Sequence, residues 1–215
     1  MGVALIADPI GSRFVASLSH PGGNLSGFTV FEASIASKSL ELLREIAPGI
    51  KRVAMIFNPD TAPFVNSLMP VFETAAKSFN IAPIAEPVHS DADIETVINS
   101  LGQEPSGALF VAPDTFMTNH RATIISLAAR NHLPAVYGPP VMARDGGLVS
   151  YAADFQDNFR RSAQYVNDIL RGAKPSELPV QMPVKYLLII NLKTAKALGI
   201  TVPQTLRVAA DEVIQ

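Results

Sequence analysis

Short apolar runs rich in β-branched residues recur along the chain, and stretches with helical periodicity separate them. One such stretch, Ser39 to Ala47, places Leu40 and Leu43 on the same helical face as Ala47. Alternation of this kind is typical of βαβ units, so the pattern predicts an α/β fold with helices covering a parallel sheet. The expected strands are Val3 to Ala7, Leu25 to Val30, Val53 to Phe57, Ile81 to Val88, Ala108 to Val111, Ala135 to Tyr137, Leu148 to Tyr151 and Tyr186 to Ile190.

A second amphipathic stretch comes late in the chain, over residues 155–171. Its apolar residues recur at three- and four-residue steps and form one stripe, which we expect to pack on the sheet. These residues are Phe155, Phe159, Ala163, Val166 and Leu170. Turn-forming residues agree with the helices: Pro48-Gly49 and Gly172 follow two of them, and Asp91 or Asp93 is predicted to cap the helix that contains Ile94, Val97 and Leu101.

Composition narrows the classes of protein to which the chain can belong. Among 215 residues, 17 Lys and Arg stand against 19 Asp and Glu, and 48% of residues are hydrophobic, which excludes a disordered chain and a polybasic nucleic-acid arm. No nucleic-acid partner is expected. No apolar run approaches the roughly 18 to 20 residues that a membrane span needs. The absence of Cys excludes disulfides and thiolate catalysis, and the first residues lack the basic start of a signal peptide.

Polar turns follow several of the predicted strands. Asn58-Pro59-Asp60-Thr61 follows the third strand and Pro113-Asp114-Thr115 the fifth, and Asp8-Pro9 follows the first. The carboxyl ends of parallel strands meet at one edge of a sheet, where open α/β sheets bind ligands. Asn58, Asp60, Thr61, Asp114 and Thr115 are therefore candidate ligand-binding residues. The alternative is that these side chains only cap helices or form Asx turns.

Aromatic and acidic residues also follow the later strands. Tyr137 ends one strand, while Tyr151 and Asp154 lie at the end of the next. A ring beside a carboxylate suits a small zwitterion, because the ring can stack while the carboxylate pairs with the ammonium. The alternative for Tyr137 and Tyr151 is a core position at a strand end.

Signatures of enzymes are missing from the sequence. It contains no Gly-x-Gly-x-x-Gly, no phosphate-binding loop, no Gly-x-Ser-x-Gly and no His-Glu-x-x-His. Its four His residues have no spacing typical of metal ligands. We therefore expect no enzyme, no cofactor and no metal site, and an enzyme that uses Asp60 or Asp114 is the least favoured hypothesis.

Several segments, taken in order, resemble a known family, the ABC transporter substrate-binding proteins of the tryptophan-binding type. The resemblance covers essentially the whole chain. It rests on Pro21-Gly22-Gly23-Asn24-Leu25-Ser26-Gly27-Phe28, Leu42-Leu43-Arg44-Glu45-Ile46-Ala47-Pro48-Gly49, Arg52-Val53-Ala54-Met55-Ile56-Phe57-Asn58-Pro59-Asp60-Thr61, Leu133-Pro134-Ala135-Val136-Tyr137, Gly146-Gly147-Leu148-Val149-Ser150-Tyr151, Asn191-Leu192-Lys193-Thr194-Ala195-Lys196-Ala197-Leu198-Gly199 and Asp211-Glu212-Val213-Ile214.

The resemblance implies a two-lobed type I periplasmic-binding-protein fold with Rossmann-like parallel sheets, which closes over a small ligand and presents it to an ABC permease in the membrane. It implies an extracytoplasmic, periplasmic location for the parent protein. The ligand would be an amino acid with an aromatic or branched apolar side chain, its ammonium meeting a carboxylate such as Asp114 or Asp154. Carried over by position, the site comprises the eight strand-end candidates named above, with Phe31 and Glu32 as weaker ones.

The resemblance also implies that the first lobe is incomplete, because members of the family have about one lobe of chain before the segment that matches residues 3–18. We expect residues 1–26 to be the remnant of the first lobe, 27–150 a complete second lobe, 151–180 a return to the first lobe and 181–215 a segment packing on the second. An uncovered sheet edge would favour a homodimer. The alternative function is a ligand-sensing regulatory domain of the same fold.

Overall fold

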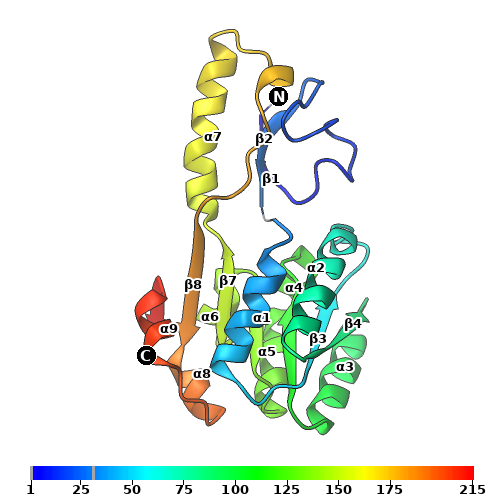
Figure 1. The fold of residues 1–215 in the computed structure, drawn as a ribbon, viewed down its shortest axis with the longest axis vertical. Coiled ribbons are helices and arrows are strands. Elements are labelled where there is room, and N and C mark those ends of the chain that lie inside the picture. The colour runs from blue at the N-terminus through cyan, green and yellow to red at the C-terminus, as the bar shows by residue number, and fades with distance from the viewer. Residues whose placement is uncertain (1, 31) are drawn as a thin grey trace. The chain divides into compact units, whose positions relative to one another are not determined.

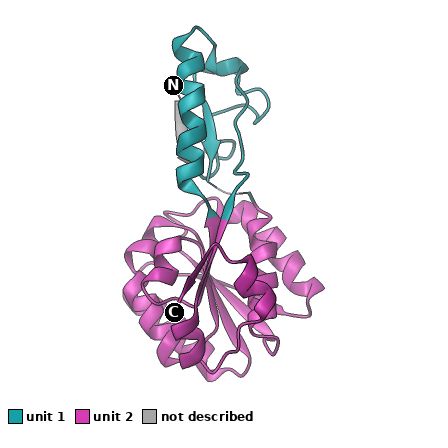
Figure 2. Ribbon diagram, turned by 90° about the vertical axis from the view of Figure 1, so that its left-hand side faces the viewer, with its two compact units in different colours: residues 1–32, 153–186 teal, residues 33–152, 187–215 magenta. Residues whose placement is uncertain are grey.

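The computed structural model describes residues 2–30 and 32–215, with the backbone alone described for residues 2–5. The chain forms two compact units (Figures 1 and 2), unit 1 from residues 1–32 and 153–186 and unit 2 from residues 33–152 and 187–215. The sequence places boundaries after residues 26, 150 and 180, and the chain passes between the units after residues 32, 152 and 186.

Unit 1 contains a short parallel sheet beside one long helix. Its elements are β1 (Gly2–Ile6), β2 (Ser26–Thr29), α7 (Phe155–Leu170) and a 3-10 turn, η1 (Pro175–Glu177). β1 and β2 pair in parallel, with Gly2 opposite Ser26. Residues 178–181 support β2 from the connector, since the Ser26 hydroxyl donates a hydrogen bond to the Leu178 carbonyl and the Thr29 N–H donates to the Gln181 carbonyl.

Unit 2 is a sheet covered by helices on both faces (Figure 1). It contains most of a seven-stranded sheet in the order β4-β3-β5-β6-β7-β8-β9. Its strands are β3 (Arg52–Phe57), β4 (Ala82–Pro87), β5 (Gly107–Val111), β6 (Ala135–Tyr137) and β9 (Glu212–Ile214), while β7 (Val149–Ala153) and β8 (Tyr186–Asn191) lie mostly within it. Its helices are α1 (Ile35–Ile46), α2 (Val65–Ser78), α3 (Asp91–Gln103), α4 (Thr115–Asn119), α5 (Arg121–Arg130), α6 (Pro140–Arg144), α8 (Leu192–Ala197) and α9 (Gln204–Ala209).

Most neighbours in this sheet run parallel, which confirms the predicted fold class. The pairs β3 with β4, β3 with β5, β5 with β6, β6 with β7 and β8 with β9 are parallel. β7 and β8 are antiparallel, because the Asn191 N–H donates to the Leu148 carbonyl and the Asp154 N–H donates to the Lys185 carbonyl. β4, which contains Pro83 and Pro87, lies at one edge, where proline is tolerated.

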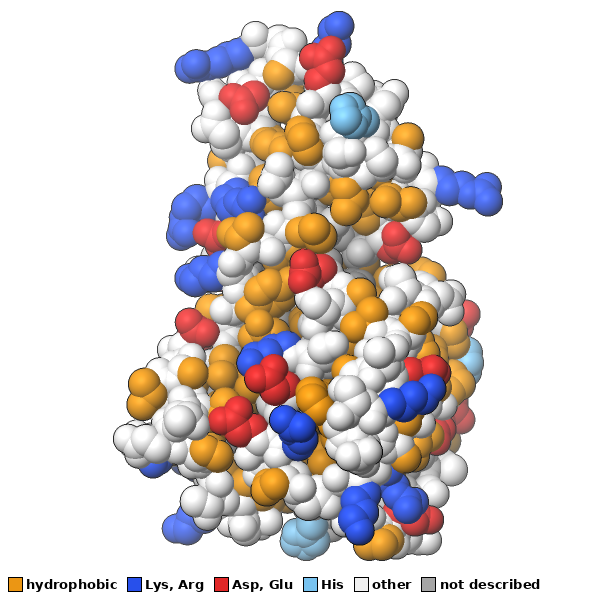
Figure 3. All heavy atoms as spheres, viewed as in Figure 1, with side chains coloured by type: hydrophobic (Ala, Val, Ile, Leu, Met, Phe, Trp, Pro, Cys, Tyr) orange, Lys and Arg blue, Asp and Glu red, His pale blue; other side chains and the backbone are white. Residues whose placement is uncertain are grey.

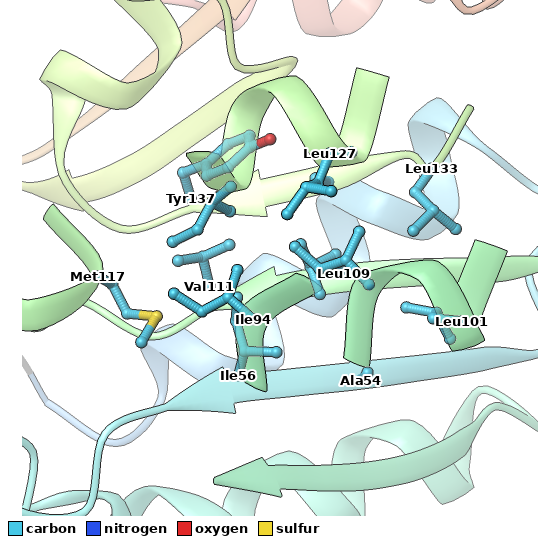
Figure 4. Packing of buried hydrophobic residues seen from close by; sticks show 14 of the residues in the cluster. Ala54, Ile56, Ile94, Leu101, Leu109, Val111, Met117, Leu127, Leu133 and Tyr137 are labelled. Carbon is cyan, nitrogen blue, oxygen red and sulfur yellow. The ribbon is translucent and has the colours of Figure 1, made fainter. Parts of the chain in front are cut away.

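Alternation along the strands separates two faces of the sheet. Side chains from one face of β3, β5 and β6 pack with α3, α4, α5 and α6 in one buried cluster (Figure 4). On the opposite face, the Phe110 ring of β5 lies 6.0 Å from the Phe72 ring of α2, and Leu40 and Leu43 of α1 are fully buried, as the periodicity predicts. The clusters on both faces hold the strand ends in fixed positions relative to one another.

The predicted N-cap of α3, Asp91 or Asp93, is wrong. The N-cap is Ser90, whose hydroxyl oxygen accepts a hydrogen bond from the Asp93 N–H. The Asp93 carboxylate in turn accepts one from the His89 N–H at 2.8 Å. Asp93 therefore belongs to a reciprocal capping arrangement rather than being the cap itself. The hydrogen bond that its carboxylate accepts from the His89 N–H is the largest cause of the lowered pKa of Asp93.

The apolar stripe of α7 does not pack on a sheet, contrary to prediction. Four of its side chains are exposed, by 39% at Phe155, 55% at Phe159, 50% at Val166 and 82% at Leu170. A neighbouring face of the helix contacts β2 instead: the Tyr165 ring lies 5.1 Å from that of Phe28, and the buried Asn158 amide donates to the Thr29 carbonyl. These contacts fix the rotation of α7, and the two-stranded sheet covers only one side of the helix.

None of the helices in the described part of the chain is long and apolar enough to cross a membrane.

Candidate functional site

The turns after β3 and β5 are joined by one buried carboxylate, that of Asp114. Its Oδ2 accepts a hydrogen bond from the Asn58 N–H at 3.2 Å, and its Oδ1 accepts one from the Thr61 hydroxyl at 3.2 Å. Oδ1 also accepts from the Met117 N–H at 2.9 Å, which makes Asp114 the N-cap of α4. Because β3 and β5 are neighbours, these hydrogen bonds hold the two predicted turns side by side.

Asp114 is committed to this structural role. Its residue is only 5% exposed, and burial raises the pKa of its carboxyl, against the opposing effect of the donors at Met117, Asn58 and Thr61. Three donors already occupy its two oxygens. The arrangement suits a residue that positions a site better than one that meets a ligand ammonium.

Asn58 shapes the turn after β3 from within. The residue is 4% exposed, and its Oδ1 accepts hydrogen bonds from the N–H groups of Asp60 at 2.9 Å and Thr61 at 3.2 Å. This is an Asx turn, which reverses the chain and holds Asp60 and Thr61 at the surface. Thr115, at the start of α4, is exposed on the neighbouring turn.

The exposed carboxylate of Asp60 is paired with a histidine. Its Oδ2 lies 3.2 Å from Nδ1 of His89, and the Asp60 side chain remains 80% exposed. A similar pair, His120 Nδ1 with Asp91 Oδ1 at 2.8 Å, joins the end of α4 to the start of α3. Two histidine–carboxylate pairs thus connect the loops beyond β3, β4 and β5.

Tyr137 lies in the core rather than at the surface of unit 2. The residue is 2% exposed and belongs to the cluster with Val111, Met117 and Met142 (Figure 4). Burial raises the pKa of its phenol. Gly147 packs directly against the ring, since a Cβ there would lie 2.6 Å from Tyr137 Cε2. This position agrees with the core alternative for Tyr137.

Tyr151 and Asp154 belong to different units and have different environments. Tyr151 lies in β7 and is half-buried. In unit 1, Oδ1 of Asp154 accepts hydrogen bonds from the N–H groups of Gln156 and Asp157 and so caps α7, while its Oδ2 lies 2.9 Å from Nζ of Lys185. The contact with Lys185 is the largest cause of the lowered pKa of Asp154, and the two backbone hydrogen bonds lower it further.

The two weaker candidates add little to the site. Phe31 lies outside the described residues, and Glu32 is half-buried in unit 1. Among the described residues, no group of three or more His, Asp or Glu side chains could hold a metal ion. The turns after β3 and β5 offer the hydroxyls of Thr61 and Thr115 and the exposed carboxylate of Asp60, which can form hydrogen bonds and an ion pair with a small polar molecule.

Two partners of the candidate residues had no signal in the sequence. Lys185 lies 31 positions after Asp154 in a connector, and His89 lies 29 positions after Asp60. Neither spacing reflects a helix or a strand period. A basic residue in a proline-rich connector and a histidine directly after a strand are the only hints that the chain itself supplies.

Comparison with known proteins gives consistent matches. The family model described as ABC transporter substrate binding protein matches residues 3–214. The chain is 25% identical over 195 residues to the tyrosine-binding protein of Clostridioides difficile, covering 90% of this chain and 55% of that relative. The chain thus spans about half the length of the curated relative that it matches.

Solved structures give the same picture. The ABC domain from Streptococcus pneumoniae in complex with L-Trp is 26% identical with a TM-score of 0.87, covering 99% of this chain and 73% of that one. A conserved domain protein from Vibrio cholerae has the same identity, 26%, and the same TM-score, 0.87, over 98% and 70% of the two chains. An ABC transporter solute-binding protein from Agrobacterium vitis, at 14% identity and a TM-score of 0.58 over 85% and 64%, shows the fold alone.

Proposed function

Because this chain belongs to the ABC transporter substrate-binding protein family, whose members bind solutes and are not enzymes, we propose that it takes part in the capture of an amino acid for import. The proposed ligand has an aromatic side chain. Two relatives support an aromatic ligand, one named as tyrosine-binding and one solved in complex with L-Trp. The proposed partner is an ABC permease in the membrane, and the proposed location is outside the cytoplasm.

The observation that carries the proposal is the pair of strand-end turns held together by Asp114. The turns present Asp60 and Thr61 beside Thr115 at the carboxyl edge of the sheet, which is where α/β sheets bind ligands. We assign Asp60 to the ligand ammonium and the two hydroxyls to its carboxylate. Asn58 and Asp114 act as positioning residues, because their polar atoms are engaged within the turns.

Tyr151 is the proposed aromatic contact for the ligand. It is half-buried, whereas the ring of Tyr137 is enclosed in the core. Stacking of a ligand ring on a tyrosine contributes about 0.5 to 1.5 kcal/mol beyond the area that it buries. The assignment makes Tyr151, not Tyr137, the tyrosine whose replacement weakens binding.

The absence of Trp from the chain makes a direct test possible. With selective excitation of indole, L-Trp is the only emitter, so its emission reports binding without a protein background. We expect L-Trp to bind and L-Tyr to displace it, whereas L-Ala and L-Glu do not displace it. Binding of none of these amino acids would contradict the proposal.

A matched pair of variants tests the assigned edge. Asp60→Asn removes a carboxylate from the proposed site. Asp91→Asn is the matched control, because it also removes an exposed carboxylate paired with a histidine but lies outside both candidate turns. We expect Asp60→Asn to weaken L-Trp binding about tenfold or more, as loss of a charge-assisted hydrogen bond does. Equal effects of the two variants would refute the role of Asp60.

A further inference from the structure

The imidazole of His89 lies beside the carboxylate that we assign to the ligand ammonium. Its Nδ1 is 3.2 Å from Oδ2 of Asp60, and the two side chains are 55% and 80% exposed. Figure 3 shows a histidine among acidic side chains at the edge of unit 2. The other carboxylate oxygen, Oδ1 of Asp60, accepts no hydrogen bond from the described residues, so it is the oxygen that can meet a ligand.

The contact determines which nitrogen of the neutral ring carries the proton. An ionised carboxylate only accepts hydrogen bonds, so the proton of neutral His89 lies on Nδ1, which faces Asp60. Nε2 is then the unprotonated nitrogen, and it forms no hydrogen bond within the described part of the chain. A second proton can therefore bind at Nε2 without breaking the contact with Asp60. Histidine is the side chain whose charge ordinarily changes between about pH 5 and 8.

The charged groups around His89 come from three elements. Asp60 faces the ring from the turn after β3. In the first turn of α3, Asp93 accepts a hydrogen bond from the His89 N–H, and Asp91 pairs with His120 at the end of α4. Of these three carboxylates, Asp60 alone belongs to a candidate turn. It is therefore the one that can couple the charge of a histidine to the ligand.

We propose that His89 is a positioning residue that makes capture of the ligand ammonium by Asp60 depend on protons. The inference rests on the proposed function, because it concerns the same carboxylate. A neutral imidazole donates to Oδ2 and orients the carboxylate, and the pair keeps one negative charge that attracts the ammonium. An imidazolium cancels that charge and repels the ammonium. Proton and ligand thus compete, and because such coupling is reciprocal, ligand binding releases a proton from His89.

The size of the effect follows from the separation of the charges. An added positive charge about 6 Å from the ammonium lowers the affinity about three- to tenfold, for an effective dielectric constant of roughly 40 to 80. The exposure of both side chains places the pair in this range rather than at the lower dielectric constants of a protein interior. The expected change is large enough to measure by titration.

Titration with L-Trp at pH 5 and pH 7, followed by indole emission, tests the proposal. An amino acid has the same charges at both values, since its carboxyl titrates below about pH 4 and its amine above about pH 7.5. We expect the wild type to bind about three- to tenfold more weakly at pH 5. His89→Gln can still donate to Asp60 but does not titrate, so it should bind nearly equally at both values. His89→Arg is always charged and should bind weakly at both.

His120→Gln is the matched control, because it removes the histidine of the other histidine–carboxylate pair. It should keep the pH dependence of the wild type. Calorimetry at pH 6, in two buffers of different ionisation enthalpy, measures the protons released when L-Trp binds. The wild type and His120→Gln should release a fraction of a proton, and His89→Gln none. Circular dichroism should show all variants folded, since the side chain of His89 is exposed and that of His120 is partly exposed.

The outcomes separate this inference from the proposed function. Equal wild-type affinities at pH 5 and pH 7, or a loss of affinity at pH 5 that persists in His89→Gln, would overturn the role of His89 and leave the capture of L-Trp intact. Absence of L-Trp binding to the wild type at both pH values would contradict the proposed function, and the role of His89 with it.

Discussion

The carboxylate of Asp154 caps α7 and at the same time pairs with Lys185, whose Nζ lies 2.9 Å from Oδ2. Both contacts favour the ionised carboxylate and lower its pKa. The stabilisation is therefore fully present above the ordinary Asp value of about 3.9 and is lost as the pH falls through the lower pKa of the folded state.

Asp154→Asn should consequently reduce stability by up to about 1 kcal/mol near neutral pH, the range for a partly exposed ion pair. Asn keeps the cap but cannot pair with Lys185. Urea unfolding at a series of pH values should show the difference from wild type shrinking below about pH 4. Asp168→Asn, on the same helix, is the matched control, because that carboxylate bonds to the neutral Gln164 amide. A difference that did not change with pH would count against the ion pair.

Asp114 should respond to pH with the opposite sign. Burial raises the pKa of Asp114 in the folded state, so ionisation of this carboxyl destabilises the fold. The stability that the protonated carboxyl contributes is fully present below the ordinary Asp pKa of about 3.9. It is lost as the pH rises through the higher pKa of the folded state. The advantage of wild type over Asp114→Asn should therefore be largest at low pH. An advantage that grew with pH would show that the hydrogen bonds outweigh burial.

Removal of the Asp114 side chain should be costly at any pH. Asp114→Ala leaves three donors without their acceptor, those of Asn58, Thr61 and Met117. We expect a loss of about 3 kcal/mol in the free energy of unfolding, from the missing cap and the unpaired groups. Denaturant unfolding measures it, and Asp91→Ala, at an exposed carboxylate, should cost much less. Similar losses in both variants would contradict the role of Asp114 as the link between the turns.

Gly147 should not tolerate a side chain. A Cβ at this position would lie 2.6 Å from the Tyr137 ring and 2.8 Å from the Met142 carbonyl oxygen. Gly147→Ala should lower stability by about 1 to 3 kcal/mol through overpacking. Gly49→Ala is the control, since nothing lies within 4 Å of a Cβ there. Thermal unfolding of both variants distinguishes them, and equal melting temperatures would be inconsistent with the close contact.

Tyr137 should matter for stability and not for the ligand. Tyr137→Ala should cost about 3 to 5 kcal/mol, as truncation of a buried aromatic residue does. Tyr137→Phe keeps the ring and should leave L-Trp binding unchanged, whereas Tyr151→Leu should weaken it. Loss of L-Trp binding in Tyr137→Phe, measured by indole emission, would show that the Tyr137 hydroxyl takes part in ligand binding.

The strands were predictable because each needs only local information. Val53 to Phe57 and Ala108 to Val111 are continuous apolar runs, and both are central strands buried on two faces. β9 was missed because Glu212–Ile214 is too short to show a period. The stripe of α7 was recognised, but its direction depends on where β2 lies. Periodicity identifies an amphipathic face and does not identify its neighbour.

The sequence predicts the location of the candidate site, the carboxyl edge of the sheet, but not the role of each residue there. Polar residues after β3 and β5 had to lie together once the strands were parallel neighbours. The division of labour among them was not predictable, because Asp60 and Asp114 look alike in the sequence. The two residues differ only in their surroundings. The Asp60 side chain is 80% exposed, whereas the Asp114 carboxylate accepts hydrogen bonds from three donors.

The prolines of β4 affect how this protein meets other strands. Ala82 and Val88 donate their N–H groups to the Lys51 and Phe57 carbonyls, at the start and the end of β3. By alternation, the N–H positions that face away from β3 are those of residues 83, 85 and 87. Pro83 and Pro87 have no N–H, so Ala85 is left as the one outward donor along β4. This edge therefore makes a poor template for a foreign strand, which protects the sheet from aggregation by strand addition.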